Sequence, residues 1–143
     1  MGIVFRPARS ADAAGLVGLV EELGYPATIA AVAERLAHLL ARADQAVFVA
    51  EEEGAILGWV HVQEFHALAS DPTGLVTGLV VDRAARRRGL GRTLMGMAEE
   101  WARARGLASL RLRARAGRKR AHEFYRRLGY ALAKEQLQFR KDL

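Results

Sequence analysis

The segment Arg86-Arg87-Arg88-Gly89-Leu90-Gly91 concentrates residue types that bind anions. It lies between an apolar run, Leu75 to Val81, and a helical pattern that runs from Leu90 to Arg105. The first N–H groups of a helix have no partner inside the helix, and the helix dipole favours negative charge there. Glycine lets the backbone approach a phosphate, and arginine supplies charge and forked donors. The pattern therefore predicts a site for a phosphorylated ligand.

The spacing of the glycines excludes two common phosphate-binding turns. A dinucleotide-binding turn needs three spaced glycines and an acidic residue about 20 positions later, whereas only Gly89 and Gly91 are present. A P-loop ends in Gly-Lys-Ser/Thr, but Gly91 is followed by Arg92 and Thr93. What remains is R-x-x-G-x-G between a predicted strand and a predicted helix.

Three segments, in order along the chain, resemble the GNAT N-acetyltransferases. The first is Phe5-Arg6-Pro7-Ala8 with Asp12, which resembles the first strand and helix start of that family. The second is Val80-Val81-Asp82 with the R-x-x-G-x-G turn, which is similar to the acetyl-CoA-binding motif. The third is Ala121-His122-Glu123-Phe124-Tyr125-Arg126-Arg127-Leu128-Gly129-Tyr130, similar to the A-x-x-F-Y-x-x-x-G-F/Y motif. Together they cover nearly the whole chain.

Hydrophobic periodicity predicts an α/β domain with a mixed sheet. Ser10 is the expected cap of a first helix that Gly24 ends, and Thr28 the expected cap of a second. The expected strands are Ile3 to Arg6, Ala46 to Glu51, Ala55 to Gln63, Leu75 to Val81, Ala108 to Arg113, Tyr130 to Leu132 and Gln136 to Arg140. Residues Leu68 to Gly74 are expected to form a loop because of Asp71-Pro72. Two more helices are expected, Leu90 to Arg105 and Lys119 to Leu128, the former burying Leu90, Leu94, Met97, Ala98 and Trp101.

The resemblance implies the GNAT-type acyl-CoA N-acyltransferase fold, with a twisted mixed sheet of six or seven strands and about four helices. It implies a single domain over residues 3–143. It also implies that acetyl-CoA is the co-substrate and that no metal is needed. The residues expected to bind acetyl-CoA are Leu79, Val80, Val81, Arg86, Arg87, Arg88, Gly89, Gly91, Arg92 and Thr93. The first three would bond the pantetheine chain through their backbone as an added strand does, and the others would hold the pyrophosphate.

The resemblance makes Tyr125 the expected general acid that protonates the leaving thiolate. On its pattern alone, Tyr125 is a core aromatic on the apolar face of the last helix, like Phe124, and only the resemblance favours the catalytic role. The general base is unassigned, because Leu75 occupies the position where many family members carry a glutamate, and Val76 to Gly78 offer no carboxylate. His61 and Glu64, at the end of the third strand, are the candidates. The segment 114–118 also lacks the asparagine that many members use to contact CoA.

Composition limits the remaining classes. The 143 residues are 51% hydrophobic, which excludes a disordered chain, and contain no cysteine, which excludes a cysteine nucleophile and a disulfide framework. The N-terminal residues do not resemble a signal peptide, and no apolar run approaches about 18 residues, so a cytoplasmic protein without a membrane span is expected. The net charge is +6, with arginines gathered at positions 83–92 and 111–127. A solvated basic face and a rim around a polyanion such as CoA both account for these clusters.

The sequence therefore predicts an N-acetyltransferase that moves acetyl from acetyl-CoA to a primary amine by direct attack. The acceptor, a small-molecule or peptide amine, is not specified by the sequence. No nucleic acid or membrane partner is expected, and the sequence is compatible with a homodimer. A non-catalytic acyl-CoA-binding or sensing module on the same fold is the alternative, because the base is unassigned. A basic nucleic-acid-binding domain is a further alternative, although no known binding module accompanies the charge.

Overall fold

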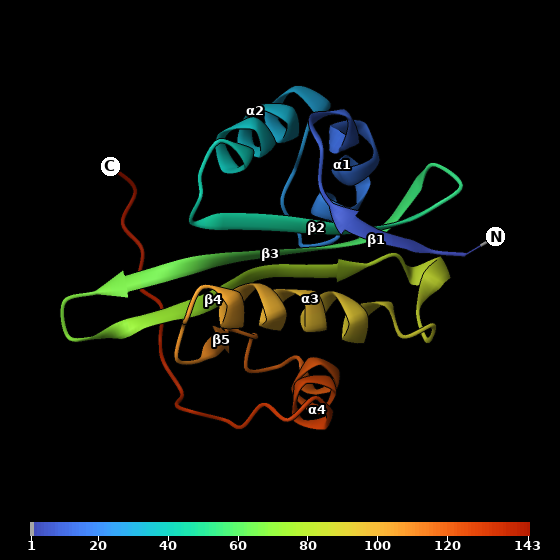
Figure 1. Ribbon diagram of the computed structural model, residues 1–143. Coiled ribbons are helices and arrows are strands. Elements are labelled where there is room, and N and C mark those ends of the chain that lie inside the picture. The colour runs from blue at the N-terminus through green and yellow to red at the C-terminus, as the bar shows by residue number, and fades with distance from the viewer. Residues whose placement is uncertain (1) are drawn as a thin grey trace. The chain divides into compact units, whose positions relative to one another are not determined.

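A computed structural model describes residues 2–143, which divide into two compact units at Arg113/Ala114. The first unit contains one five-stranded sheet in the order β1-β2-β3-β4-β5 (Figure 1). Its strands are β1 (Val4–Pro7), β2 (Gln45–Glu52), β3 (Ala55–Ala67), β4 (Ser70–Val81) and β5 (Leu110–Leu112). All neighbours are antiparallel except β4 and β5, which are parallel. This mixed sheet confirms the predicted fold class, although the described residues contain five strands rather than six or seven.

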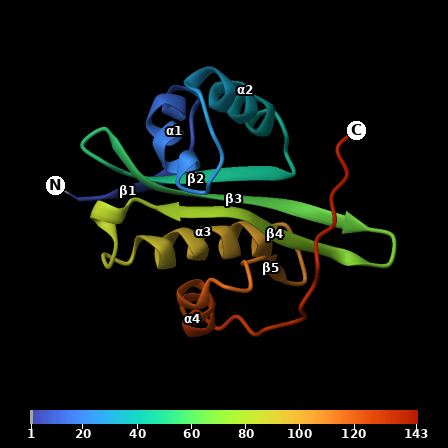
Figure 2. The same ribbon diagram turned by 180° about the vertical axis from the view of Figure 1, so that it is seen from behind.

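Helices cover both faces of this sheet (Figures 1 and 2). The helices α1 (Ala13–Glu21) and α2 (Ile29–Leu40) lie on one face, and α3 (Leu90–Ala104) lies on the other. Short 3₁₀ turns, η1 (Ser10–Asp12) and η2 (Arg83–Ala85), precede α1 and α3. Because both faces are covered, Leu75 and Val76, successive residues of β4 on opposite faces, are both buried, and Val60 and Val62 of β3 are fully buried on one face.

Local sequence explains where several of these elements begin and end. The Thr28 hydroxyl accepts a hydrogen bond from the Ala31 N–H at 3.1 Å, so the predicted cap of α2 is confirmed. Ser10 does not cap α1 as predicted, because it belongs to η1. Instead, Asp12 accepts from the Arg9 N–H at 2.7 Å. Asp12 also receives two hydrogen bonds from Arg6, both at 2.8 Å, which joins β1 to the start of α1.

Two predicted segments differ in the structure. The segment predicted as a loop, Leu68 to Gly74, is mostly strand, because β4 already begins at Ser70 and only two residues connect it to β3. Helix α3 buries Leu90, Leu94 and Ala98 as predicted, but it buries Met95 and Ala102 rather than Met97 and Trp101, which are half-buried.

The second unit, Ala114–Leu143, contains α4 (Lys119–Arg127). The predicted strands Tyr130 to Leu132 and Gln136 to Arg140 are wrong, since residues 130–143 form no regular element and Leu137 and Phe139 are 83% and 88% exposed. Within the unit, the His122 Nε2 donates to the Arg115 carbonyl at 2.8 Å and ties the start of α4 to the preceding turn.

Candidate active site

Strand β4 has a free edge in its second half. It pairs with β5 only from Gly74 to Val76, while its pairing with β3 continues to Val81. The Asp82 N–H donates to the Leu57 carbonyl at 2.8 Å, and the alternation of antiparallel bonds then turns the backbone groups of Val80 and Gly78 toward β3. The N–H and C=O groups of Leu79 and Val81 therefore point to the side that β5 has left open.

A bulge lies at the point where β4 loses contact with β5. His61 pairs with Gly78, but Val62 pairs with Val76, so Thr77 is an extra residue on β4. The ring of Trp59 lies directly over Gly78, where an added Cβ would come within 2.5 Å of the indole. The bulge changes the direction of the strand next to the free backbone groups of Leu79, and any larger residue at position 78 would have to displace the Trp59 ring.

The turn that follows β4 ends on the N-terminus of α3. Arg87 has φ +68° and the cap residue Gly89 has φ +76°, so two left-handed residues lie within three positions. The first bond of α3 runs from the Thr93 N–H to the Gly89 carbonyl at 3.1 Å, which leaves the N–H groups of residues 90–92 without a partner inside the helix. An added Cβ on Gly89 would meet no atom within 4 Å, so the turn is open to a ligand.

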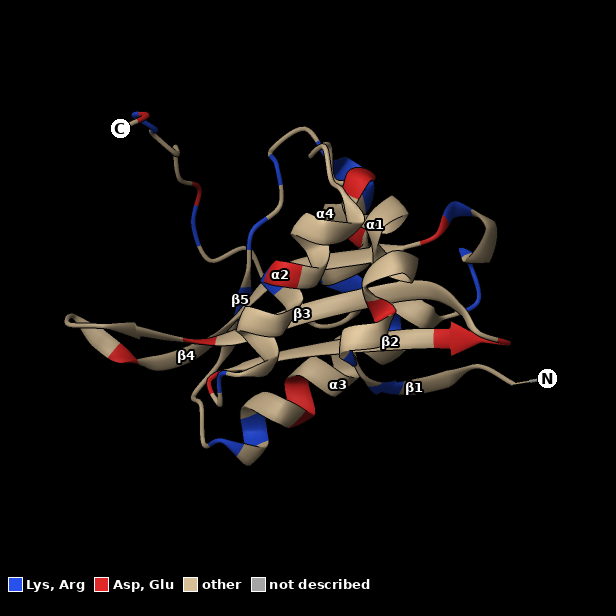
Figure 3. Ribbon diagram, turned by 90° about the horizontal axis from the view of Figure 1, so that it is seen from above, with Lys and Arg blue, Asp and Glu red and all other residues tan. Residues whose placement is uncertain are grey.

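The arginines of this turn differ in their partners. Figure 3 shows the run of basic residues between β4 and α3, and the acidic end of β2. Arg88 forms an ion pair with Glu52 at 2.8 Å. Within residues 2–143, no carboxylate lies within ion-pair distance of Arg86, Arg87 or Arg92, and all three are exposed. Their charge is therefore available to an anion at the helix N-terminus.

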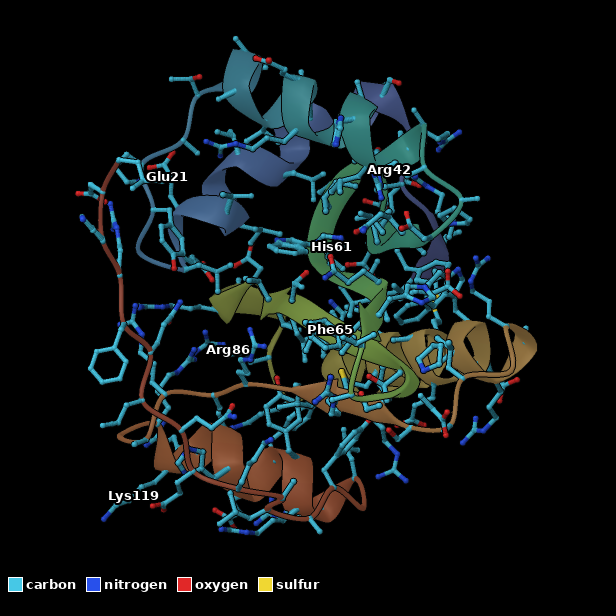
Figure 4. The ribbon with its side chains drawn as sticks, turned by 90° about the vertical axis from the view of Figure 1, so that its left-hand side faces the viewer. Glu21, Arg42, His61, Phe65, Arg86 and Lys119 are labelled. Carbon is cyan, nitrogen blue, oxygen red and sulfur yellow. The ribbon has the colours of Figure 1, made fainter. Side chains whose placement is uncertain are left out.

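The structure separates the two candidate bases. His61 is half-buried on the face of the sheet that carries α1 and α2 (Figure 4). It lines an open groove of about 680 Å³ with the α2 residues Ala31, Glu34, Arg35, His38 and Leu39. Burial lowers the pKa of His61, so its imidazole is neutral at pH 7. Glu64 instead forms an ion pair with Arg105, beyond the end of α3, at 3.0 Å, which lowers the pKa of its carboxyl group. A carboxylate held in this way is a poor base.

His61 has partners that sequence reasoning missed. Its ring contacts Gln45 on β2 and Thr77 on β4, both at 2.6 Å. These residues lie 16 positions before and after His61 along the chain. No short-range pattern signals such a contact, because the strand register and the bulge bring the three side chains together.

Tyr125 lies in the second unit, on α4, and is half-buried. Its ring packs edge-on against Phe124 and Tyr130, with centroids 5.1 and 6.1 Å apart. Burial raises the pKa of the Tyr125 hydroxyl, partly offset by Arg118, so this hydroxyl keeps its proton throughout the neutral range. The general-acid role of Tyr125 stays a prediction.

Comparison with known proteins identifies the family. A model of the acetyltransferase (GNAT) family matches residues 18–130. The chain belongs to the GNAT family. This confirms the family resemblance, the class of enzyme, an acetyl-CoA-dependent N-acetyltransferase, and acetyl-CoA as co-substrate. No curated protein sequence is a significant match.

Solved GNAT structures share the fold at low sequence identity. An aminoglycoside N-acetyltransferase, AAC(6')-Iy, in complex with CoA superposes with a TM-score of 0.88 at 17% identity, covering 99% of this chain and 96% of the other. A putative acetyltransferase from Agrobacterium tumefaciens gives 0.86 at 26% identity, with 96% and 99% covered. An aminoglycoside 6'-N-acetyltransferase from Acinetobacter haemolyticus gives 0.83 at 22% identity, with 100% and 99% covered.

Two further observations bear on the class of site. Among residues 2–143 there is no group of three or more histidine or acidic side chains arranged to hold a metal ion. No helix in that part of the chain is both long and apolar enough to cross a membrane.

Proposed function

We propose that this GNAT enzyme transfers acetyl from acetyl-CoA to the primary amine of a small molecule by direct attack of the amine on the thioester. The observation that carries the proposal is the continuity of two features. The free edge of β4, at Leu79 and Val81, leads within a few residues to the open N-terminus of α3. A ligand with an amide-containing arm and a pyrophosphate matches both features in that order.

The turn supplies the contacts that a pyrophosphate needs. Free N–H groups at the start of α3, around Gly91, would donate to its oxygens, and Arg86, Arg87 and Arg92 would neutralise its charge. The Thr93 hydroxyl donates to the Gly89 carbonyl at 3.1 Å and stabilises the turn that presents these groups. Arg88 is held by Glu52, so we assign it to shaping the turn.

The edge of β4 would hold the pantetheine arm. The N–H and C=O groups of Leu79 and Val81 would bond it as an added strand does, whereas Val80 contributes its buried side chain to the core. The Leu79 N–H, beside the bulge, is also a donor for the oxyanion that forms when the amine attacks. Tyr125 would then protonate the departing thiolate, and its raised pKa keeps it a donor at neutral pH.

Ion pairs at the end of β2 favour an acceptor with few positive charges. Glu51 and Glu52, the last two residues of β2, pair with Arg6 at 3.1 Å and with Arg88 at 2.8 Å, so neither of these carboxylates is left uncompensated for a polycation. The arginines next to them would repel a polycationic acceptor. The aminoglycoside enzymes compared above are at most 22% identical to this chain, so the likeness to them extends to the fold alone.

Two measurements test this function. Calorimetry with CoA should give saturable binding, and thiol release from acetyl-CoA should rise on addition of a monoamine such as butylamine, more than on addition of kanamycin. CoA binding without thiol release from any amine of a broad panel would instead support the acyl-CoA-sensing alternative. Failure to bind CoA would contradict both.

A further inference from the structure

His61 is held at both ring nitrogens by side chains from the two neighbouring strands. Its Nε2 lies 2.6 Å from Gln45 Oε1, and its Nδ1 lies 2.6 Å from Thr77 Oγ1. The three side chains form a continuous chain of hydrogen bonds across β2, β3 and β4. Such short contacts at both nitrogens fix the ring plane and leave it no freedom to flip.

The chemistry of these partners determines the tautomer of His61. An amide oxygen only accepts, so the proton of the neutral ring is on Nε2 and points to Gln45. The lone pair is then on Nδ1, and the Thr77 hydroxyl donates its proton to it. Glu34, Arg35 and His38 of α2 line the same groove, but the cause of the lowered pKa of His61 is burial. The ring is therefore neutral and ready to accept a proton through Thr77.

Thr77 lies where an incoming amine would arrive. It is the extra residue of the β4 bulge, it is exposed, and it precedes by two residues Leu79, whose backbone groups face the open edge. The Thr77 oxygen has a lone pair left after its own proton is donated to His61. A proton accepted by that oxygen can pass to Nδ1 without movement of either side chain.

We propose that Thr77 and His61 form the proton relay that deprotonates the amine acceptor, with Gln45 as a positioning residue that holds the ring. The inference rests on the proposed function and supplies the base that the sequence of β4 lacks. An N–H proton of the acceptor ammonium moves to Thr77 Oγ as the Thr77 proton moves to His61 Nδ1. The free amine then forms the N–C bond with the thioester carbonyl, the C–S bond breaks as Tyr125 protonates the sulfur, and the second nitrogen proton restores the Tyr125 hydroxyl. The imidazolium returns its proton to water, so one proton is released in each turnover.

Substitution of Thr77 tests the relay. Thr77→Val keeps the shape of the side chain but removes the hydroxyl, so thiol release from acetyl-CoA with butylamine should fall roughly 10²-fold or more, the usual range for general base catalysis. Thr77→Ser keeps the hydroxyl and should retain most of the rate. Thr73→Val is the matched control on the same strand, because the Thr73 hydroxyl is buried without a hydrogen-bond partner. CoA affinity measured by calorimetry should be unchanged in all three variants.

The pH profile separates a relay from a structural contact. In the wild type, kcat/KM should fall at acid pH as His61 becomes protonated, and this fall should lie below pH 6.5 because burial lowers the pKa of His61. Gln45→Glu places a carboxylate against the Nε2 proton and raises the pKa of His61, so the fall should move to higher pH. His66→Gln, at the exposed end of β3, is the matched histidine control and should leave the profile unchanged. A ¹⁵N-histidine NMR titration reads the same pKa and the Nε2–H tautomer without any acceptor.

The outcomes are distinguishable from failure of the proposed function. A wild-type protein that neither binds CoA nor releases thiol contradicts the proposed function and the relay with it. A wild-type protein that releases thiol while Thr77→Val does so at the same rate overturns the relay alone. So does an Nδ1–H tautomer of His61, or an acetylated Thr77 peptide after single turnover, which would make Thr77 a nucleophile.

Discussion

Arg88 donates both terminal guanidinium nitrogens to the carboxylate of Glu52, at 3.2 and 2.8 Å. This contact joins the basic turn before α3 to the end of β2, and it lowers the pKa of Glu52 and raises that of Arg88. The pair is exposed, so it contributes little to global stability. Its effect is local. Arg88 is held by Glu52 and shapes the turn, whereas the charges of Arg86, Arg87 and Arg92 are available to a ligand.

Arg86 and Arg88 should therefore contribute differently to CoA binding. We expect Arg86→Ala to weaken binding by about 1–3 kcal/mol, the range for a charge-assisted hydrogen bond. Arg88→Ala should cost less, and Glu52→Gln, which keeps every arginine and releases Arg88, should not weaken binding. Calorimetry with CoA measures all three. A larger loss in Arg88→Ala than in Arg86→Ala would reverse the roles assigned here.

Gly89→Val should abolish CoA binding. Gly89 has φ +76°, which a β-branched residue adopts only with strain, and its Cβ direction faces the open space above the turn. The expected result is loss of the calorimetric signal with the circular dichroism spectrum retained. Gly96→Ala, within α3, is the matched control, because an added Cβ there meets nothing within 4 Å and the backbone is helical. Wild-type affinity in Gly89→Val would contradict the placement of the phosphates.

The sequence predicted the elements whose signals are local. Thr28 caps α2 through its own hydroxyl, and the predicted glycine turn lies directly before α3, where Gly89 is the cap residue. The pair Asp71-Pro72 predicted a loop, but Pro72 lies within β4. A proline has no N–H to donate to a neighbouring strand, and it fits here because β5 pairs with β4 only from Gly74 onward. The alternation of Leu137 and Phe139 is typical of a strand, but alternation does not provide a neighbouring strand to pair with.

The parts of the site that residue patterns alone do not specify, apart from the family resemblance, depend on register. The open edge of β4 exists because β5 stops pairing at Val76, and nothing within 75–81 encodes the length of β5. Thr77 meets His61 because of a one-residue bulge, which changes the face of the sheet on which the side chain of β4 lies at this point. Residue types alone made His61 a candidate base, but the partners that make its chemistry specific come from strands 16 residues away in each direction.

Asp12 should make stability depend on acid pH. Its hydrogen bonds from Arg6 lower the pKa of its carboxyl group below that of the unfolded chain, about 3.9. The stabilisation is therefore fully present above that unfolded value and is lost as the pH falls through the lower folded pKa. We expect Asp12→Asn to reduce the free energy of unfolding at pH 7 by about 3 kcal/mol, the low end for a broken buried pair, because Arg6 keeps Glu51.

Urea unfolding at several pH values measures this effect. The difference between the wild type and Asp12→Asn should shrink as the pH falls through the folded pKa of Asp12. Asp44→Asn is the matched control, because Asp44 also pairs with an arginine, Arg42, but at an exposed site where the pair should have little effect. A difference that stays constant down to pH 2 would show that Asp12 acts through packing rather than through its charge.

Tyr125→Phe should slow turnover while the fold and CoA affinity are retained. The ring still packs edge-on against Phe124 and Tyr130, so the substitution removes only the hydroxyl. Because the raised pKa of Tyr125 keeps that hydroxyl protonated at neutral pH, it can donate to a departing thiolate. A thiolate, with a pKa near that of a free thiol, about 8.5, leaves tolerably without help. We therefore expect a loss of roughly 10²-fold in thiol release, the low end for general acid catalysis.

Tyr130→Phe removes a hydroxyl from the neighbouring ring and should leave the rate unchanged. Equal rates in Tyr125→Phe and the wild type would make Tyr125 a core aromatic and leave the thiolate to be protonated by water.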